Sequence, residues 1–101
     1  MIRKVRVTKW AQKNLESCPR HIQSKFKWWL ELVERIGIEA ARLIPGLHDE
    51  PLKGNRTGQR SIRLNRSWRA IYVLREDGCA QGCPKRYIEF IEVQEIHKHD
   101  Y

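Results

Sequence analysis

The stretch Lys53–Arg75 decides how this chain folds, and its sequence is KGNRTGQRSIRLNRSWRAIYVLR. Apolar and polar residues alternate in Gln59–Asn65, and Arg69–Arg75 is rich in the β-branched and aromatic residues that favour strands. Only a short turn at Arg66-Ser67 separates the two runs, so they are expected to pair as antiparallel strands. A disordered basic segment would not carry this apolar pattern. The stretch is therefore predicted to be a folded, two-stranded element.

The same stretch concentrates the positive charge of the chain. It holds seven of the 20 basic residues and no Asp or Glu, whereas the other 78 residues carry 13 basic and 12 acidic side chains. Since Ile62 and Leu64 are expected to be buried, Arg63 should lie on the opposite, solvent-facing side of its strand. A concentrated cationic face most often binds a polyanion, and nucleic acid is the commonest one. The seven cations are Lys53, Arg56, Arg60, Arg63, Arg66, Arg69 and Arg75.

The residues before the hairpin predict one strand followed by helices. Ile2–Val7 alternates apolar and polar residues as a strand does, and Thr8 is suited to cap a helix that runs to about Cys18. Pro19 fits the first turn of a second helix, and Gly37 is suited to end it. The first helix is expected to turn Trp10, Ala11, Leu15 and Cys18 towards the core. The second helix is expected to bury positions that recur every three or four residues, namely Ile22, Phe26, Trp29, Val33 and Ile36.

A shorter helix is predicted at Ile38–Leu43. After the hairpin, Glu76–Arg86 contains glycines and a proline and is expected to be a long loop. Tyr87–Ile96 predicts a final strand, with a bulge near Phe90-Ile91, where apolar residues are consecutive. The order of elements predicts a single α+β domain over residues 1–101, in which two or three helices pack on one face of a mainly antiparallel sheet.

Several functional classes are excluded by composition. No apolar run approaches the roughly 20 residues that a membrane-spanning helix needs, and Met1-Ile2-Arg3-Lys4 is not followed by the apolar segment of a signal peptide. Three cysteines cannot form a complete disulfide framework, so reduced thiols in a cytoplasmic protein are expected. Cys79 and Cys83 are spaced C-x3-C in a loop, away from the His-x-His pair formed by His97 and His99. No metal site and no cofactor are therefore predicted.

The last residues of the chain are candidates for proton transfer. If the final strand continues to the end, His97, His99 and Tyr101 share one face, because residues two apart in a strand point the same way. Imidazoles donate and accept protons near neutral pH. The alternative is a solvated polar tail, but antiparallel pairing would place this strand end beside the basic hairpin.

Three further side chains have two interpretations each. The loop around Pro51 and Gly54 contains Glu50 and Lys53, which form either an ordinary surface ion pair or part of a site at the edge of the sheet. Trp68 either stacks on a nucleic-acid base or packs against the turn.

Four segments together resemble the RelE/ParE superfamily of bacterial toxins, most closely its HigB-like and YoeB-like members. These segments are EPLKG at Glu50–Gly54, GQRSIRL at Gly58–Leu64, WRAIY at Trp68–Tyr72 and the terminal His99-Asp100-Tyr101. The predicted order of elements is similar to the microbial-ribonuclease-like fold of that superfamily over essentially the whole chain.

The resemblance implies the toxin of a type II toxin-antitoxin system that cleaves messenger RNA on the ribosome and stops translation. It implies a metal-independent endoribonuclease in which the 2′-hydroxyl attacks the adjacent phosphate and leaves a 2′,3′-cyclic phosphate. It also implies a cognate antitoxin as a partner, small and DNA-binding, encoded beside the toxin. Two alternatives stay open: a ParE-like inhibitor of DNA gyrase with the same fold, and a non-catalytic nucleic-acid-binding module.

The resemblance also assigns roles to individual residues. Glu50 stands where YoeB-like toxins place a carboxylate proposed as the general base, and Lys53 and Arg69 are expected to stabilise the charge on the phosphate. The general acid is His99 or His97, with Tyr101 orienting it, because the order here is His-Asp-Tyr rather than an adjacent His-Tyr pair. Glu50 or the other histidine would then be the base. The remaining side chains expected to bind RNA are Arg56, Arg60, Arg63, Arg66 and Trp68.

Overall fold

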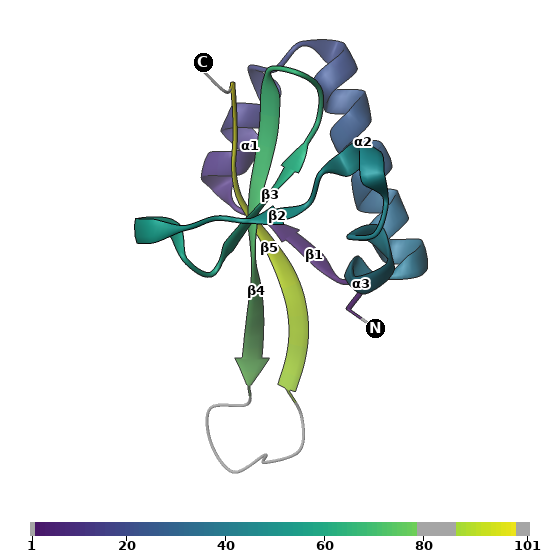
Figure 1. Ribbon diagram of the computed structural model, residues 1–101, viewed down its shortest axis with the longest axis vertical. Helices are drawn as coiled ribbons and strands as arrows, with labels where there is room; N and C mark the ends of the chain where they lie inside the picture. The colour runs from purple at the N-terminus through teal and green to yellow at the C-terminus, as the bar shows by residue number, and fades with distance from the viewer. Residues whose placement is uncertain (1, 79–86, 99–101) are drawn as a thin grey trace.

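Five strands form one sheet, and the helices pack against it (Figure 1). The computed structural model describes residues 2–78 and 87–98. Its elements follow in the order β1 (Val5–Val7), α1 (Lys9–Glu16), α2 (Arg20–Ile36), α3 (Ile38–Ala41), η1 (Pro45–Leu47), β2 (Glu50–Pro51), η2 (Gly54–Arg56), β3 (Gln59–Arg63), β4 (Trp68–Gly78) and β5 (Tyr87–Lys98). The two η elements are single turns of 3₁₀ helix.

The spatial order of the strands is β1-β5-β4-β3-β2. β1 pairs with β5 in parallel, and every other neighbouring pair is antiparallel. The predicted hairpin is the pair β3 and β4, and Asn65 closes its turn by accepting hydrogen bonds from the backbone N–H groups of Ser67 and Trp68. The structure thus confirms an α+β fold with a mainly antiparallel sheet.

The predicted helix boundaries follow from their capping residues. The Thr8 hydroxyl accepts a hydrogen bond from the backbone N–H of Ala11 (3.0 Å) and so caps α1. Gly37 ends α2 with φ = 85°, a backbone angle that residues with a Cβ atom rarely adopt. The next backbone N–H, that of Ile38, donates to the carbonyl of Ile2 (2.8 Å), which ties the helices to the start of the chain.

The core lies between α2 and the sheet. Trp29 and Tyr72 are its largest fully buried side chains, and their ring centroids are 5.6 Å apart. Phe26 adds a second aromatic contact to Trp29 at 5.9 Å. The amphipathic pattern of the second helix therefore predicts four of its five buried side chains; it missed Leu32, and Ile36 is only partly buried.

One core prediction was wrong: Trp10 is 63% exposed. Ala11 and Cys18 are buried and Leu15 packs against the core, so the inner face of α1 follows positions 11, 15 and 18. Trp10 lies about 100° around the helix from Ala11, because successive residues of an α-helix are separated by that angle. Its side chain therefore leaves the core face.

The final strand also differs from its prediction. The pairing of β4 with β5 is regular at Phe90-Ile91, where a bulge was expected, and shifts instead opposite Ile71 and Tyr72. Phe90 and Ile91 are consecutive apolar residues because both faces are covered there: Ile91 lies in the core, and the Arg6 guanidinium lies 4.2 Å from the centre of the Phe90 ring. The predicted loop is also shorter, since β4 continues through Gly78.

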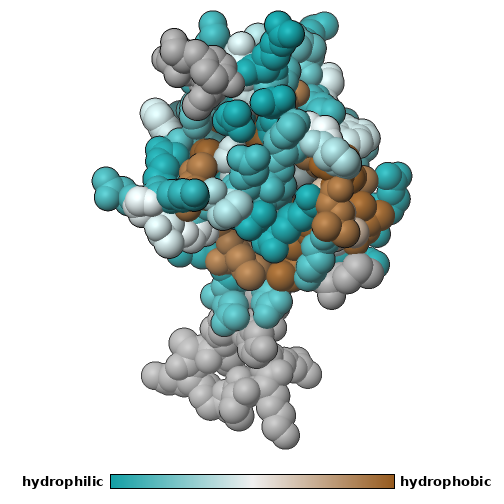
Figure 2. All heavy atoms as spheres, viewed as in Figure 1, coloured by the Kyte–Doolittle hydropathy of each residue, from teal (hydrophilic) through white to brown (hydrophobic). Residues whose placement is uncertain are grey.

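Much of the face of the molecule shown in Figure 2 is hydrophilic. Hydrophobic side chains gather in only a few small areas on the face shown there. In the part of the chain that the structure describes, no helix is both long and apolar enough to cross a membrane.

We predict that Trp29→Ala lowers the free energy of unfolding by about 3–5 kcal/mol, because it empties the centre of the core. The adjacent Trp28 provides a matched control, since it is 41% exposed and contacts only Lys25 over its ring face among the ring contacts described. Trp28→Ala should cost less than about 1 kcal/mol. Urea unfolding followed by circular dichroism measures both values, and similar losses for the two variants would contradict this account of the core.

Candidate active site

A pocket of about 360 Å³ opens on the face of the sheet that points away from the core. Four strands and the turn after β2 contribute to its wall. The residues that line it are Glu50, Leu52, Arg56, Ser61, Arg69, Ile71 and His97. Three side chains with predicted chemical roles, Glu50, Arg69 and His97, thus lie in one depression.

Strand register explains why these side chains meet. Directly opposite residues in paired strands point to the same face of a sheet. Arg69 on β4 is opposite His97 on β5 and opposite Arg63 on β3. Ser61 is likewise opposite Glu50 on β2, so the base candidate and the histidine approach from opposite sides of the hairpin.

Arg69 lies at the centre of the arrangement. One of its terminal nitrogens, Nη1, is 3.5 Å from the Ser61 hydroxyl, a contact that orients the guanidinium across β3. Within residues 2–78 and 87–98, no acidic side chain forms an ion pair with Arg69. Among the described side chains, Arg69 therefore contributes an unpaired positive charge to the wall of the pocket.

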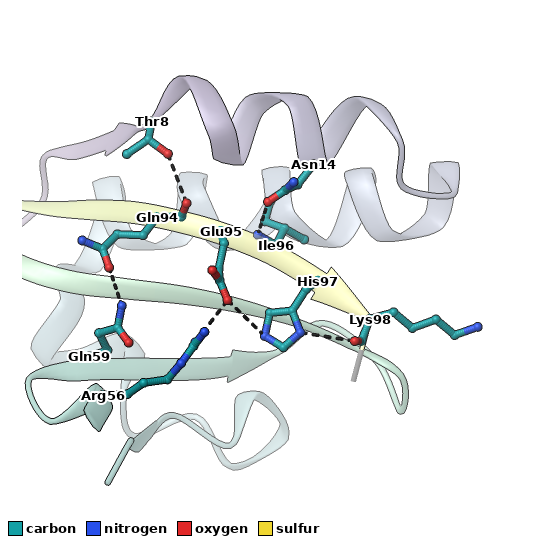
Figure 3. A network of polar contacts seen from close by, with 9 residues as sticks. All are labelled: Thr8, Asn14, Arg56, Gln59, Gln94, Glu95, Ile96, His97 and Lys98. Carbon is teal, nitrogen blue, oxygen red and sulfur yellow. Dashed lines mark hydrogen bonds and ion pairs between the residues drawn. The ribbon is translucent and has the colours of Figure 1, made fainter. Parts of the chain in front are cut away.

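His97 has a hydrogen-bond acceptor near each ring nitrogen (Figure 3). Its Nδ1 lies 3.2 Å from the backbone carbonyl of Lys98, and a carbonyl oxygen only accepts, so this contact is a hydrogen bond in the forms of the ring that carry a proton on Nδ1. Its Nε2 lies 3.6 Å from Oε1 of Glu95. Arg56 donates from Nη1 to that same oxygen at 3.1 Å. Glu95 therefore connects the η2 turn to the imidazole.

The sequence interpretation missed Glu95. The signal was present, because Glu95 precedes His97 by two residues and so shares its face of β5. Arg56 was expected to bind RNA, but in the structure it forms an ion pair with Glu95.

The cationic stretch is partly neutralised by acidic residues that are distant in sequence. Arg56 pairs with Glu95, Arg60 with Asp49 (2.6 Å) and Arg75 with Glu92 (3.2 Å). Four cations have no acidic partner among the described residues: Lys53, Arg63, Arg66 and Arg69. The positive charge of the hairpin is thus focused on fewer positions than the sequence suggests.

Arg60 lies apart from the pocket, on the core side of β3. It is opposite Tyr72 in the register, and its Nε donates to Oδ1 of Asp49. The Asp49 side chain is only 1% exposed and also accepts a hydrogen bond from the Tyr72 hydroxyl through Oδ2. Arg42 donates from Nε to the Tyr72 oxygen at 3.3 Å. Arg60 therefore serves a buried polar network rather than an RNA-binding face.

One member of this network, Asp49, directly precedes Glu50 in the sequence. Asp49 fixes the chain at the start of β2 because its carboxylate is bound by two side chains from two strands, Arg60 of β3 and Tyr72 of β4. Burial, followed by the hydrogen bond to Asp49, raises the pKa of Tyr72 well above its ordinary value of 10.0. The Tyr72 phenol in this network is therefore neutral, and the network holds Glu50 at the edge of the pocket.

The other predicted residues are distributed around the pocket. Trp68 is half-buried and packs against the core, which supports a role in packing the turn. Arg63 is half-buried beside Arg69, whereas Arg66 and Lys53 are exposed and do not line the pocket. The candidate catalytic residues His99 and Tyr101 lie outside the described residues, as do Cys79 and Cys83, for which no catalytic role is predicted.

No grouping of three or more His, Cys, Asp or Glu side chains suited to a metal ion occurs among the described residues.

The fold is similar to those of solved toxins. The YoeB/ParE toxin from Agrobacterium tumefaciens matches with a TM-score of 0.65 and 19% identity, over 96% of this chain and 99% of that chain. The E. coli DinJ-YafQ toxin-antitoxin complex matches with a TM-score of 0.68 and 17% identity, over 98% and 94%. The YoeB-YefM complex from Staphylococcus aureus matches with a TM-score of 0.62 and 20% identity, over 97% of each chain.

The chain therefore has the fold of the YoeB, ParE and YafQ toxins, as its resemblance to the RelE/ParE superfamily predicts. The sequence itself matches no protein-family model and no curated protein.

We predict that the Tyr72 network makes folding stability depend on alkaline pH. A phenol whose pKa is raised by folding contributes stability that is complete below its unfolded pKa and is lost as pH rises above it. Wild-type stability should therefore fall above about pH 10, with Tyr72 adding up to about 1.4 kcal/mol per pH unit to the slope. Tyr72→Phe should show a shallower decline while being less stable at pH 7. Urea unfolding between pH 8 and 11 tests this, and identical slopes for the two proteins would refute it.

Proposed function

We propose that this protein is the toxin of a type II toxin-antitoxin system and acts as a metal-independent, ribosome-dependent endoribonuclease on messenger RNA. The observation that supports this function best is the convergence of Glu50, Arg69 and His97 in one pocket. A carboxylate, a guanidinium and an imidazole supply the proton acceptor, the fixed cation and the proton donor that cleavage of RNA by its own 2′-hydroxyl uses. Membership of the RelE/ParE superfamily is part of the proposal.

In the proposed reaction, Glu50 accepts the proton of the 2′-hydroxyl while that oxygen forms a bond to the adjacent phosphorus. The bond from phosphorus to the 5′-oxygen breaks, and an imidazole donates a proton to the leaving oxygen. The products are a 2′,3′-cyclic phosphate and a free 5′-hydroxyl, so the step needs no water and no redox partner. Of the two candidate acids, His97 lines the pocket; His99 and the orienting Tyr101 stay proposals from the resemblance.

Arg69 is proposed to stabilise the charge that develops on the phosphorane. Fixed cations near a developing charge are usually the largest single contribution to such catalysis. Lys53 is exposed on the turn after β2 and would approach the phosphate from that side. Arg63 and Arg66, which lack acidic partners among the described residues, would bind the RNA backbone on either side of the cleaved bond.

A cognate antitoxin is the proposed protein partner. One solved structure with a similar fold is the E. coli DinJ-YafQ toxin-antitoxin complex. The cations that line β3 and its turn suit an acidic segment that folds over them, since complementary charge speeds and orients association. Translating ribosomes carrying messenger RNA are the proposed target.

We predict that Arg69→Ala, His97→Ala and Glu50→Gln each slow transcript cleavage by about 10²–10⁴-fold, because each removes a proton-transfer group or a fixed cation. The assay is cleavage of a messenger RNA on translating ribosomes, combined with mapping of 5′ ends in cells after induced expression. Arg35→Ala is the matched control, since it removes an exposed cation of α2 far from the pocket residues in sequence. It should cleave at the wild-type rate.

Two results would contradict the proposal. Cleavage by all three variants at the wild-type rate would show that the pocket is not the active site. Inhibition of gyrase supercoiling by a wild-type protein that leaves transcripts intact would instead establish the ParE-like alternative.

A further inference from the structure

The spacing of buried residues in β5 reveals an extra residue near the pocket. Val93 and Ile96 are both buried in the core cluster, although they are three positions apart. In a regular strand an odd separation puts side chains on opposite faces. The register accounts for the difference, because Tyr72 pairs with Val93 while its neighbour Ile71 pairs with Glu95. Gln94 is therefore the additional residue of a β-bulge.

The bulge determines which way the candidate catalytic side chains point. Regular alternation from Val93 would direct Glu95 and His97 into the core and Ile96 towards the pocket. With Gln94 inserted, Ile96 returns to the core and His97 reaches the pocket wall. The orientation of the imidazole thus depends on a single backbone irregularity.

Thr8, which caps α1, and Asn14 within α1 bind backbone groups of β5 on either side of the bulge (Figure 3). The Thr8 hydroxyl donates to the carbonyl of Gln94 at 3.2 Å, and the Asn14 Oδ1 accepts from the N–H of Ile96 at 3.1 Å. The backbone N–H of Thr8 also donates to the carbonyl of Val93 at 3.1 Å. These bonds satisfy groups on both sides of Gln94, and unsatisfied groups there would cost about 1–3 kcal/mol each.

We propose that Asn14 and Thr8 are positioning residues for the active site. Helix α1 packs on the core side of β5, contacts no pocket-lining residue through these bonds, and yet sets the register in which Glu95 and His97 face the pocket. The inference rests on the proposed function insofar as it predicts cleavage rates. The placement of the His97 ring is a structural consequence that can be measured separately.

The test compares Asn14→Ala with Asn14→Asp, whose carboxylate oxygen still accepts a hydrogen bond from Ile96. Asn14→Ala should slow cleavage on ribosomes by about 10²-fold, the typical effect of a misplaced catalytic group. Binding of an uncleavable RNA with a 2′-deoxy nucleotide at the cleavage site should stay within about threefold of wild type. Asn14→Asp should restore most of the rate, and Gln12→Ala, on the exposed face of the same helix, should match wild type.

Two measurements separate a positioning role from general destabilisation. In the His97→Ala background, Asn14→Ala should cause no further loss of rate, because its effect passes through the imidazole. In the single variant Asn14→Ala, nuclear magnetic resonance should show faster exchange of the Ile96 amide and altered ¹⁵N shifts of the His97 ring. If Asn14→Ala fails to fold, Asn14→Gln shifts the acceptor by one methylene and is judged by the same readouts.

The two proposals fail in different ways. If the wild-type protein does not cleave RNA, the proposed function is wrong, and the resonances of Ile96 and His97 alone decide the positioning role. If Asn14→Ala leaves both resonances unchanged, or cleaves at the wild-type rate, the positioning role is overturned whatever the function.

Discussion

Strand β4 pairs with β3 on one side and β5 on the other, and the site depends on this register. Through it, Arg69 faces Arg63 and His97 directly, and Ser61 extends the same face to Glu50 on β2. The opposite face of the same strands carries Tyr72 and the core. A shift of one residue would exchange the two faces, so burial of the core and orientation of the pocket are enforced together.

Charge in this molecule is arranged by the fold as much as by the sequence. The basic stretch lacks acidic residues of its own, yet Asp49, Glu92 and Glu95 come from outside it to pair with three of its arginines. These pairs reduce repulsion along the hairpin while leaving Arg69 without an acidic partner among the described residues. A cationic run in sequence is therefore a poor measure of the charge that a ligand meets.

Local patterns predicted much of the fold. The alternation of the hairpin, the apolar spacing of α2 and the capping residues Thr8 and Gly37 depend on near neighbours, so they can be recognised in the sequence. The bulge at Gln94 could not be predicted in this way, because its partners Thr8 and Asn14 lie 86 and 82 residues from the groups they bind.

Some features of the candidate site could also be predicted from the sequence, and others could not. The proximity of Arg69 and His97 follows from strand order alone, and it was predicted. Glu95 as a partner of His97 could have been predicted, because the two residues share one face of β5, whereas Asp49 as a buried anchor beside Glu50 depends on how distant segments meet in three dimensions. The assignments to His99 and Tyr101 stay predictions.

The parallel pairing of β1 with β5 has a consequence for biosynthesis. Val5–Val7 can find its place in the sheet only after Val93 and its neighbours have left the ribosome, since these are its partners. Until then the growing chain has an incomplete sheet and no His97 beside Arg69. The pocket of a polypeptide proposed to attack translation is therefore incomplete until β5 has left the ribosome.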